Sequence, residues 1–349
     1  MEQCFVFPAV RGLQAGKPYY VIMCPLGLVT KLFTYTDSSL PADMRVQRTL
    51  NTQRIPEICN YILENQDSYA FSALTASVDG ELEFKSIVEN SALGKLHIPS
   101  NARVIINDGQ HRRAAIEAAL VKQPDLRHED ISVVIYYDLG LRRSQQIFSD
   151  LNRYAIRPTK SLNILYDNRD EFSILIKECI PKILVFNGNV ETEKSTLSNR
   201  SKELFTLSGI FYASKLLLQK TEISNEHLAD VIVYYWNAVA ENMPVWDIAR
   251  LRDISPEVFR QDYVCAHTIT LKALGTIGNK LISSGVEREN WSKQLEFLAE
   301  IDWRKDNPEL QGIVMVNGKI ASSHSNQRAF VRYILEKAGW DSKEAIDRK

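Results

Sequence analysis

The sequence has few cysteines, and they are widely scattered. No two of the five lie within four residues of each other; they are Cys4, Cys24, Cys59, Cys179 and Cys265. This spacing excludes a Cys-x-x-Cys pair or a zinc knuckle. An odd, scattered set favours buried, reduced thiols in a cytosolic protein over a disulfide framework.

Long apolar runs are also missing. A membrane-spanning helix needs roughly 18 to 20 predominantly apolar residues, and no stretch of this chain is that long. Residues 1–3 lack the basic segment of a secretory signal, and Arg11, Lys17 and Pro25 interrupt the apolar residues that follow. We therefore expect a cytoplasmic protein with no membrane partner.

An excess of basic residues is absent as well. The chain has 42 Lys and Arg against 43 Asp and Glu, which gives a formal net charge of -1. A protein that coats nucleic acid through bulk charge would be strongly basic. If this protein binds DNA, local basic patches on a near-neutral surface must do so.

The common catalytic motifs are not found. The sequence has no Gly-x-Ser-x-Gly, no Walker Gly-Lys-Ser/Thr and no His-Glu-x-x-His motif. Asp108 and Asp150 leave open a magnesium site, because Mg²⁺ commonly uses one or two carboxylates together with phosphates. We assign no catalytic residue and no metal ligand, and we lean against an enzyme.

What is present indicates an α+β protein with two domains. The 349 residues, 45% of them hydrophobic, are more than one compact core usually holds. Domain 1–150 alternates β-rich and helical segments, with strands predicted over 19–23, 27–35, 71–78, 82–84, 102–106 and 131–137 and helices over 56–65 and 110–121. Asp79-Gly80 predicts a hairpin turn, and the strand-helix-strand order of 102–137 predicts a crossover with a parallel pairing.

Helical periodicity dominates from about residue 142 and throughout domain 151–349. Helices are predicted over 142–152, 160–178, 201–219, 224–242, 262–284, 287–299 and 326–338. Ser201, Ser224 and Asn326 are the predicted N-caps, and Gly285 and Gly339 the predicted C-terminal stops. The polar segment 186–200 is the predicted exposed loop.

The most informative segment is a predicted turn from strand to helix. The apolar residues 104–106 are followed by Asp108-Gly109-Gln110-His111-Arg112-Arg113. Free N–H groups at the start of a helix bind anions, and glycine lets a ligand approach the backbone closely. Three basic side chains at a helix N-terminus disfavour the helix, and a bound phosphate would relieve this conflict. In the alternative reading, Asp108 caps the helix and pairs with Arg112, and Arg113 is solvated.

Asp108-Gly109-Gln110-His111-Arg112 is the signature of the DGQHR-domain proteins, and the chain resembles the DndB group of that family. Supporting blocks are Gln47-Arg48-x-Leu50, Arg54 to Ile58, Phe148 to Arg153, Asp302-Trp303 and Gly312. The resemblance implies a regulator of a bacterial DNA phosphorothioate (sulfur) modification gene cluster. It also implies a first domain similar to the ParB/sulfiredoxin fold, in which the equivalent turn binds nucleotide phosphates. Gln110 stands where sulfiredoxins have their catalytic cysteine, so that chemistry is not expected, and CTP specificity does not follow either.

A second polar cluster lies between residues 150 and 160. Asp150 and Arg153 are spaced to pair on one helix, and Thr159 is placed to cap the next. One interpretation is a solvated helix junction. In the other, which the resemblance favours, Asn152 and Arg153 complete the phosphate site at Asp108.

Further basic residues form a predicted DNA-backbone patch, with a solvated surface as the alternative. They are Arg45, Arg48, Arg54, Arg157, Lys160, Arg200 and Lys202. Lys194, Arg200 and Lys202 surround the predicted helix start at 201, where a phosphate could also bind. Tyr234, Tyr235 and Trp236 are adjacent on a helix and so point in different directions, which favours core packing over base stacking.

The resemblance implies a transcriptional repressor that binds double-stranded DNA upstream of its own gene cluster. A homo-oligomer is expected because palindromic operators call for paired modules. Other DNA-modification proteins are alternative partners. The alternative function is a nucleotide-dependent enzyme or switch, binding a nucleoside triphosphate with Mg²⁺ at the Asp108 turn. No cofactor is required by the first reading.

Overall fold

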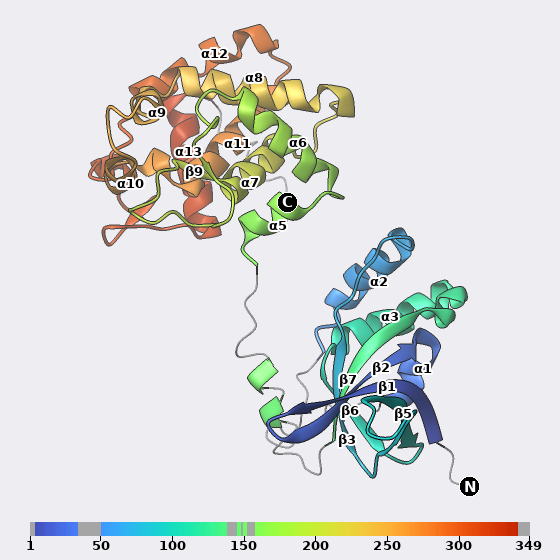
Figure 1. The fold of residues 1–349 in the computed structure, drawn as a ribbon. Helices are drawn as coiled ribbons and strands as arrows, with labels where there is room; N and C mark the ends of the chain where they lie inside the picture. The colour runs from blue at the N-terminus through green and yellow to red at the C-terminus, as the bar shows by residue number, and fades with distance from the viewer. Residues whose placement is uncertain (1–3, 34–49, 138–144, 148, 152–157, 341–349) are drawn as a thin grey trace. The chain divides into compact units, whose positions relative to one another are not determined.

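A computed structural model describes residues 4–33, 50–137, 145–147, 149–151 and 158–340. The chain divides into two compact units, Met1–Ile156 and Arg157–Lys349. The first combines a β-sheet with helices, and the second is mainly helical (Figure 1). The predicted α+β class is therefore confirmed.

The first unit is built on one seven-stranded sheet with the order β4-β5-β1-β2-β7-β3-β6. The strands are β1 (Cys4–Gln14), β2 (Lys17–Pro25), β3 (Leu74–Asp79), β4 (Glu83–Ser86), β5 (Leu93–Pro99), β6 (Arg103–Asp108) and β7 (Asp130–Tyr137). Only β3 and β7 pair in parallel; all other neighbours are antiparallel. The sheet is mixed, as predicted, but β6 and β7 are separated by β3 and do not form the expected parallel crossover.

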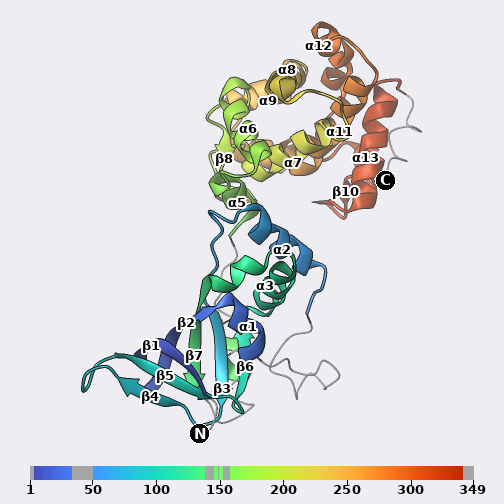
Figure 2. The same cartoon turned by 90° about the vertical axis from the view of Figure 1, so that its right-hand side faces the viewer.

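Three helices and a 3₁₀ turn pack against the buried face of this sheet. They are α1 (Leu26–Leu32), α2 (Arg54–Glu64), α3 (Gln110–Lys122) and η2 (Pro124–His128), and Figure 2 shows the three helices on the same side of the sheet. Alternate residues of β7, Ile131, Val133 and Ile135, enter the core, where they join Ile62 of α2 and Ile116 of α3. This is the alternation expected of a strand with one covered face.

Two local predictions in this unit were wrong. The segment predicted as a strand over 27–35 forms α1 where the structure describes it, because Leu26, Val29 and Leu32 at helical spacing all reach the core. The hairpin predicted at Asp79-Gly80 does not form, since β3 pairs with β6 and β7 while β4 pairs with β5. Strands β1 and β5 were not predicted.

The second unit is a helical assembly with very short strand pairs. Its helices are α5 (Lys160–Tyr166), α6 (Glu171–Cys179), α7 (Leu207–Leu217), α8 (Leu228–Glu241), α9 (Pro244–Arg250), α10 (Pro256–Asp262), α11 (Thr268–Ser283), α12 (Trp291–Gln294) and α13 (His324–Lys337). The strand pairs are β8 (Val190–Glu191) with β9 (Phe205–Thr206), and β10 (Met315–Val316) with β11 (Lys319–Ile320). Short 3₁₀ turns are η3 (Ile180–Lys182), η4 (Asn225–His227), η5 (Val264–Ala266), η6 (Arg288–Asn290), η7 (Glu296–Glu300) and η8 (Pro308–Leu310). Tyr235 and Trp236 are buried in this core, as predicted, whereas Tyr234 is 39% exposed; Trp303 is buried there as well.

Several predicted helix boundaries in this unit required correction. The segment 160–178 forms two helices, because Asp170 caps a new start at α6. The helix predicted from 201 begins at Leu207 with Thr206 as its N-cap, and α13 is capped by Ser323 and not by Asn326. Segment 287–299 contains the short α12 between 3₁₀ turns, and α9 and α10 were not predicted. Gly285 and Gly339 have φ of +72° and +66° and end their helices as predicted.

Candidate functional site

The strand-to-helix turn forms as the sequence predicts. Asp108 ends β6, Gly109 is the N-cap of α3 with φ +103°, and Gln110 begins the helix. A Cβ atom added at Gly109 would lie 2.3 Å from Leu74 Cδ2, so both the backbone angle and the packing require glycine. Gly109 has no side chain that could cap α3, and no side-chain cap is found there among the described residues. The first N–H groups of α3 therefore keep the orientation of an anion-binding helix start.

Arg112 is engaged within the unit and holds the turn against the chain that enters β3. Its Nη2 donates to Asp108 Oδ2 at 2.7 Å, and its Nη1 donates to the carbonyl oxygen of Ser72 at 2.5 Å, to the Ser72 hydroxyl and to the carbonyl oxygen of Ala73 at 3.2 Å. The pairing of Asp108 with Arg112, one of the two readings of the sequence, is therefore present. Asp108 does not act as the cap, since that position is Gly109.

Arg113 is buried, contrary to the solvated position in that same reading. Its side chain is only 5% exposed, and its Nη1 lies 3.0 Å from Glu117 Oε2. Its Nη2 donates to the carbonyl oxygen of Thr30 in α1 at 3.3 Å. Arg113 thus ties α3 to α1, and its charge is compensated within the unit.

His111 faces the start of α2. Its Nε2 accepts a hydrogen bond from the backbone N–H of Asn51 at 3.1 Å. Burial, and then the nearby charge of Arg54, lower the pKa of His111 below its usual value. Among the described residues, no carboxylate lies within ion-pair distance of His111 or Arg54. Two basic groups from two helix starts are therefore brought together without an acidic partner.

The remaining predicted site residues are distributed as follows. Arg45, Arg48, Asn152, Arg153 and Arg157 lie outside the described residues. Gln110 is buried at the start of α3, and Asp150 accepts a hydrogen bond from Gln146. Thr159 caps α5 through the N–H of Leu162, as predicted, and this places Lys160 at the first position of that helix.

Arg200 and Lys202 are exposed, but they do not stand at a helix start. They belong to a loop held from inside by Arg260, a buried side chain that the sequence analysis missed. Arg260 donates to the carbonyl oxygens of Asn199, Ser201 and Glu203 at 2.7–3.0 Å. The phosphate site predicted at a helix N-terminus near 201 is therefore not formed, since α7 begins at Leu207.

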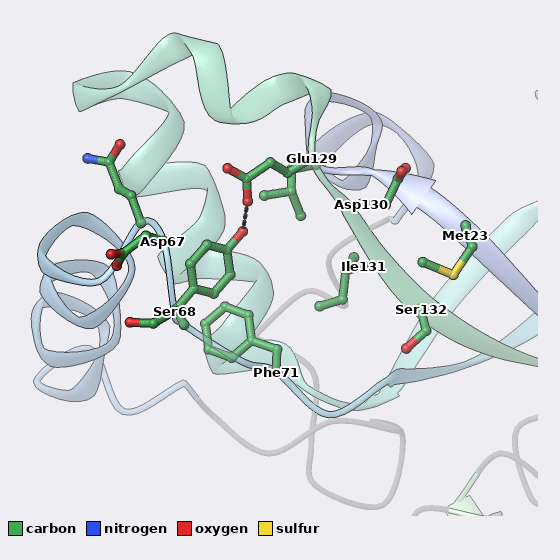
Figure 3. Close-up of a pocket in the computed structure, with 11 residues that line it drawn as sticks. Met23, Asp67, Ser68, Phe71, Glu129, Asp130, Ile131 and Ser132 are labelled. Carbon is green, nitrogen blue, oxygen red and sulfur yellow. Dashed lines mark hydrogen bonds between the residues drawn. The ribbon is translucent and has the colours of Figure 1, made fainter. Parts of the chain in front are cut away.

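A pocket of about 470 Å³ opens in the first unit between the end of β2 and the start of β7 (Figure 3). Its walls include Tyr69 and Phe71, and the Tyr69 hydroxyl donates to Glu129. Burial, and then the carboxylate of Glu129, raise the pKa of Tyr69 above its usual value. The lining holds three acidic residues, Asp67, Glu129 and Asp130, and no basic one. The three carboxylates give the pocket a negative charge that disfavours a phosphate ligand.

The described part of the chain offers neither a metal-binding cluster nor a membrane-spanning helix. No group of three or more His, Cys, Asp or Glu side chains is arranged to hold a metal ion. No helix there is long and apolar enough to cross a membrane.

Among known proteins, one family resembles this chain along nearly its whole length. The family model described as DndB, DNA-sulfur modification-associated, matches residues 7–341, which is nearly the whole chain. No curated protein and no solved structure matches the sequence. The similarity of the first unit to the ParB/sulfiredoxin fold therefore stays a prediction.

Proposed function

The chain belongs to the DndB family of DNA-sulfur modification-associated proteins, and from this premise we propose that it is a DNA-binding regulator. Specifically, it represses a DNA phosphorothioate modification gene cluster by binding the double-stranded DNA upstream of it. The near-neutral net charge requires that a local site, not the whole surface, makes the contact. Two copies of the chain would read the two halves of a palindromic operator.

The observation that carries this proposal is the position of His111 at the start of α3, where it is hydrogen-bonded to Asn51, three residues before the charged Arg54 that begins α2. Arg54 carries a positive charge, and the helix dipole adds further positive character at the same point, so His111 stays neutral there. A DNA phosphate at this position would accept hydrogen bonds from the N–H groups of the first turn and would pair with Arg54. His111 would remain neutral, with Nε2 accepting from the Asn51 N–H, and its Nδ1–H would donate to the phosphate.

The other residues of the signature have supporting roles in this proposal. Gly109 allows the turn, while Asp108 and Arg112 hold it against β3. Arg113 joins α3 to α1. Asn152 and Arg153 remain predicted parts of the phosphate site at Asp108. The predicted contacts to the DNA backbone are Arg45, Arg48, Arg157, Lys160, Arg200 and Lys202.

Fluorescence anisotropy on labelled upstream DNA across a salt series tests the proposal. The informative variant is Arg54→Gln/His111→Gln, and Arg103→Gln/His128→Gln is the matched control because both of its residues are exposed in the same unit. Arginine substitutions at 112 or 113 are less informative, since they also remove contacts that hold the fold. Loss of one phosphate contact should make the slope of log K against log salt shallower by about 1 and weaken binding roughly tenfold.

The proposal fails if the Arg54/His111 variant and its control bind DNA alike. If the wild-type protein shows no salt-dependent DNA binding at all, the turn serves another anion. A thermal-shift screen with ATP, CTP and GTP, each with Mg²⁺, would then test the nucleotide-switch alternative. A nucleotide at about 100 times its Kd stabilises a protein by about 2.7 kcal/mol, which such a screen detects.

A further inference from the structure

Three elements of the second unit bring two lysines to one exposed aromatic ring. We call this the Tyr212 cluster; it consists of Lys160 in α5, Tyr212 in α7 and Lys272 in α11. The Nζ atoms of Lys160 and Lys272 lie 5.6 and 5.7 Å from the centre of the Tyr212 ring. Helix α7 packs against both α5 and α11, so the three side chains come from elements that are held together.

The backbone that carries Lys160 is fixed on both sides. The Thr159 side chain caps α5, and its hydroxyl also donates to the carbonyl oxygen of Glu193. The Ser161 hydroxyl bonds the carbonyl oxygen of Lys194 at 2.9 Å and the Ser208 hydroxyl at 3.0 Å. The position of Lys160 at the ring therefore follows from a buried network and not from a free loop.

The charges of the Tyr212 cluster are uncompensated. Within the described residues, no carboxylate lies at ion-pair distance from Lys160 or Lys272. Partial burial, and then the charge of Lys160, lower the pKa of Lys272. Lysine ammonium groups are attracted to the face of a tyrosine ring, but they repel each other, and an anion between them would remove that repulsion.

The exposed tyrosine ring favours an anion that also carries an apolar group. Tyr212 is 36% exposed, so an apolar ring surface faces solvent beside the two lysines. Inorganic phosphate would pair with the lysines but would leave the ring exposed. A DNA phosphodiester would pair with the lysines through its phosphate, and its deoxyribose would pack against the ring. Phosphate and sugar contacts of this kind position a protein on DNA without reading its sequence.

We infer that the Tyr212 cluster is a second DNA-backbone site, in which Lys160 and Lys272 bind one phosphate and Tyr212 contacts the adjoining sugar. The inference rests on the proposed DNA-binding function. It adds Tyr212 and Lys272, which the sequence did not single out, to the predicted contact Lys160.

Salt-dependent anisotropy with the full-length protein and upstream DNA tests the inference. The variant is Lys160→Gln/Lys272→Gln, and the control is Lys293→Gln/Lys319→Gln, which removes the same charge from exposed positions of the same unit. The expected result is a slope shallower by about 1 and an affinity several-fold weaker for the cluster variant alone. Tyr212→Ser should weaken binding and leave the slope unchanged. Competition by inorganic phosphate at matched ionic strength should leave DNA binding unchanged.

A second measurement does not depend on the folding of any variant. Lysines of the wild-type protein are acetylated with and without saturating upstream DNA, and the modified peptides are mapped. DNA is expected to protect Lys160 and Lys272 but not Lys293 or Lys319. If wild type binds DNA in a salt-dependent way but the cluster variant matches its control or Lys160 and Lys272 are not protected, this inference is wrong and the proposed function stands. If wild type shows no salt-dependent binding, the proposed function itself has failed.

Discussion

Replacing Gly109 with alanine is the sharpest test of the turn on which the candidate site depends. Gly109 has φ +103°, and the new Cβ would lie 2.3 Å from Cδ2 of Leu74, a fully buried side chain of β3. A left-handed backbone costs a non-glycine residue about 1–2 kcal/mol. Overpacking a filled core costs about 1–3 kcal/mol more. We therefore expect Gly109→Ala to lower the free energy of unfolding of the first unit by about 2–5 kcal/mol.

Gly16 provides the matched control. It lies in the turn between β1 and β2 with φ +73°, and a Cβ there would meet nothing within 4 Å. Gly16→Ala should therefore show the backbone cost alone, about 1–2 kcal/mol.

Urea unfolding of the full chain can separate the two units by probe. All five tryptophans, at 236, 246, 291, 303 and 340, lie in the second unit, so their fluorescence reports on it, while hydrogen exchange over 74–122 reports on the first. Loss of exchange protection in the first unit, with an unchanged tryptophan transition, is the expected pattern. Equal effects of Gly109→Ala and Gly16→Ala would refute the argument that Leu74 closes the space beside the turn.

Three further predictions concern the second unit. Arg260→Met removes the donors to the carbonyl oxygens of residues 199, 201 and 203. Urea unfolding followed by tryptophan fluorescence should show a free energy of unfolding lower by at least about 3 kcal/mol. An unchanged midpoint would contradict the role of Arg260 in holding this loop. Burial, and then the charge of Lys305, lower the pKa of His267 to about 4 in the folded protein. As the pH falls, the unfolded chain therefore takes up a proton at His267 before the folded protein does. The free energy of unfolding should fall by roughly 3 kcal/mol between about pH 6.5 and about pH 4. His267→Gln should flatten that pH profile, and a profile identical to wild type would show that other groups cause it. Thr159→Ala removes the α5 cap and should cost about 1 kcal/mol, whereas Thr159→Ser should cost much less; equal losses would argue against capping.

Local signals in the sequence were enough to predict the candidate turn. An apolar strand, a glycine and a helix follow each other within about twenty residues, and α3 spans Gln110–Lys122 against a prediction of 110–121. Each of these signals is set by neighbours in the chain. Local signals also predicted the helix α2, from apolar residues near one face, and the strand β7, from a nearly continuous apolar run.

Pairings between distant segments were not predictable in this way. Asp79-Gly80 has the composition of a hairpin turn, yet β3 is buried between β6 and β7, and long-range packing decided its partners. Residues 27–32 contain good strand formers, but they form a helix because that conformation buries Val29 and Leu32 in the core. Sequence propensity is a weak guide where tertiary packing competes with it.

The roles of individual arginines were also beyond the sequence. Arg112 and Arg113 look alike as neighbours in a basic turn, but one binds carbonyl oxygens of residues 72 and 73 and the other is buried against α1. Arg260 looks like an ordinary surface residue of a short helix, and its three carbonyl partners lie about sixty residues earlier in the chain. Long polar side chains take their function from contacts that only the folded chain brings together.

The central claim is that this protein is a DNA-binding regulator, and a comparison of two DNAs tests it most directly. The affinity of the full-length protein would be measured by anisotropy for DNA from upstream of its own modification gene cluster and for unrelated DNA of equal length, each across a salt series. We predict a steep salt dependence for both and an upstream affinity on the order of a thousandfold higher at physiological salt. Equal affinities, or no salt-dependent binding to either DNA, would contradict the account.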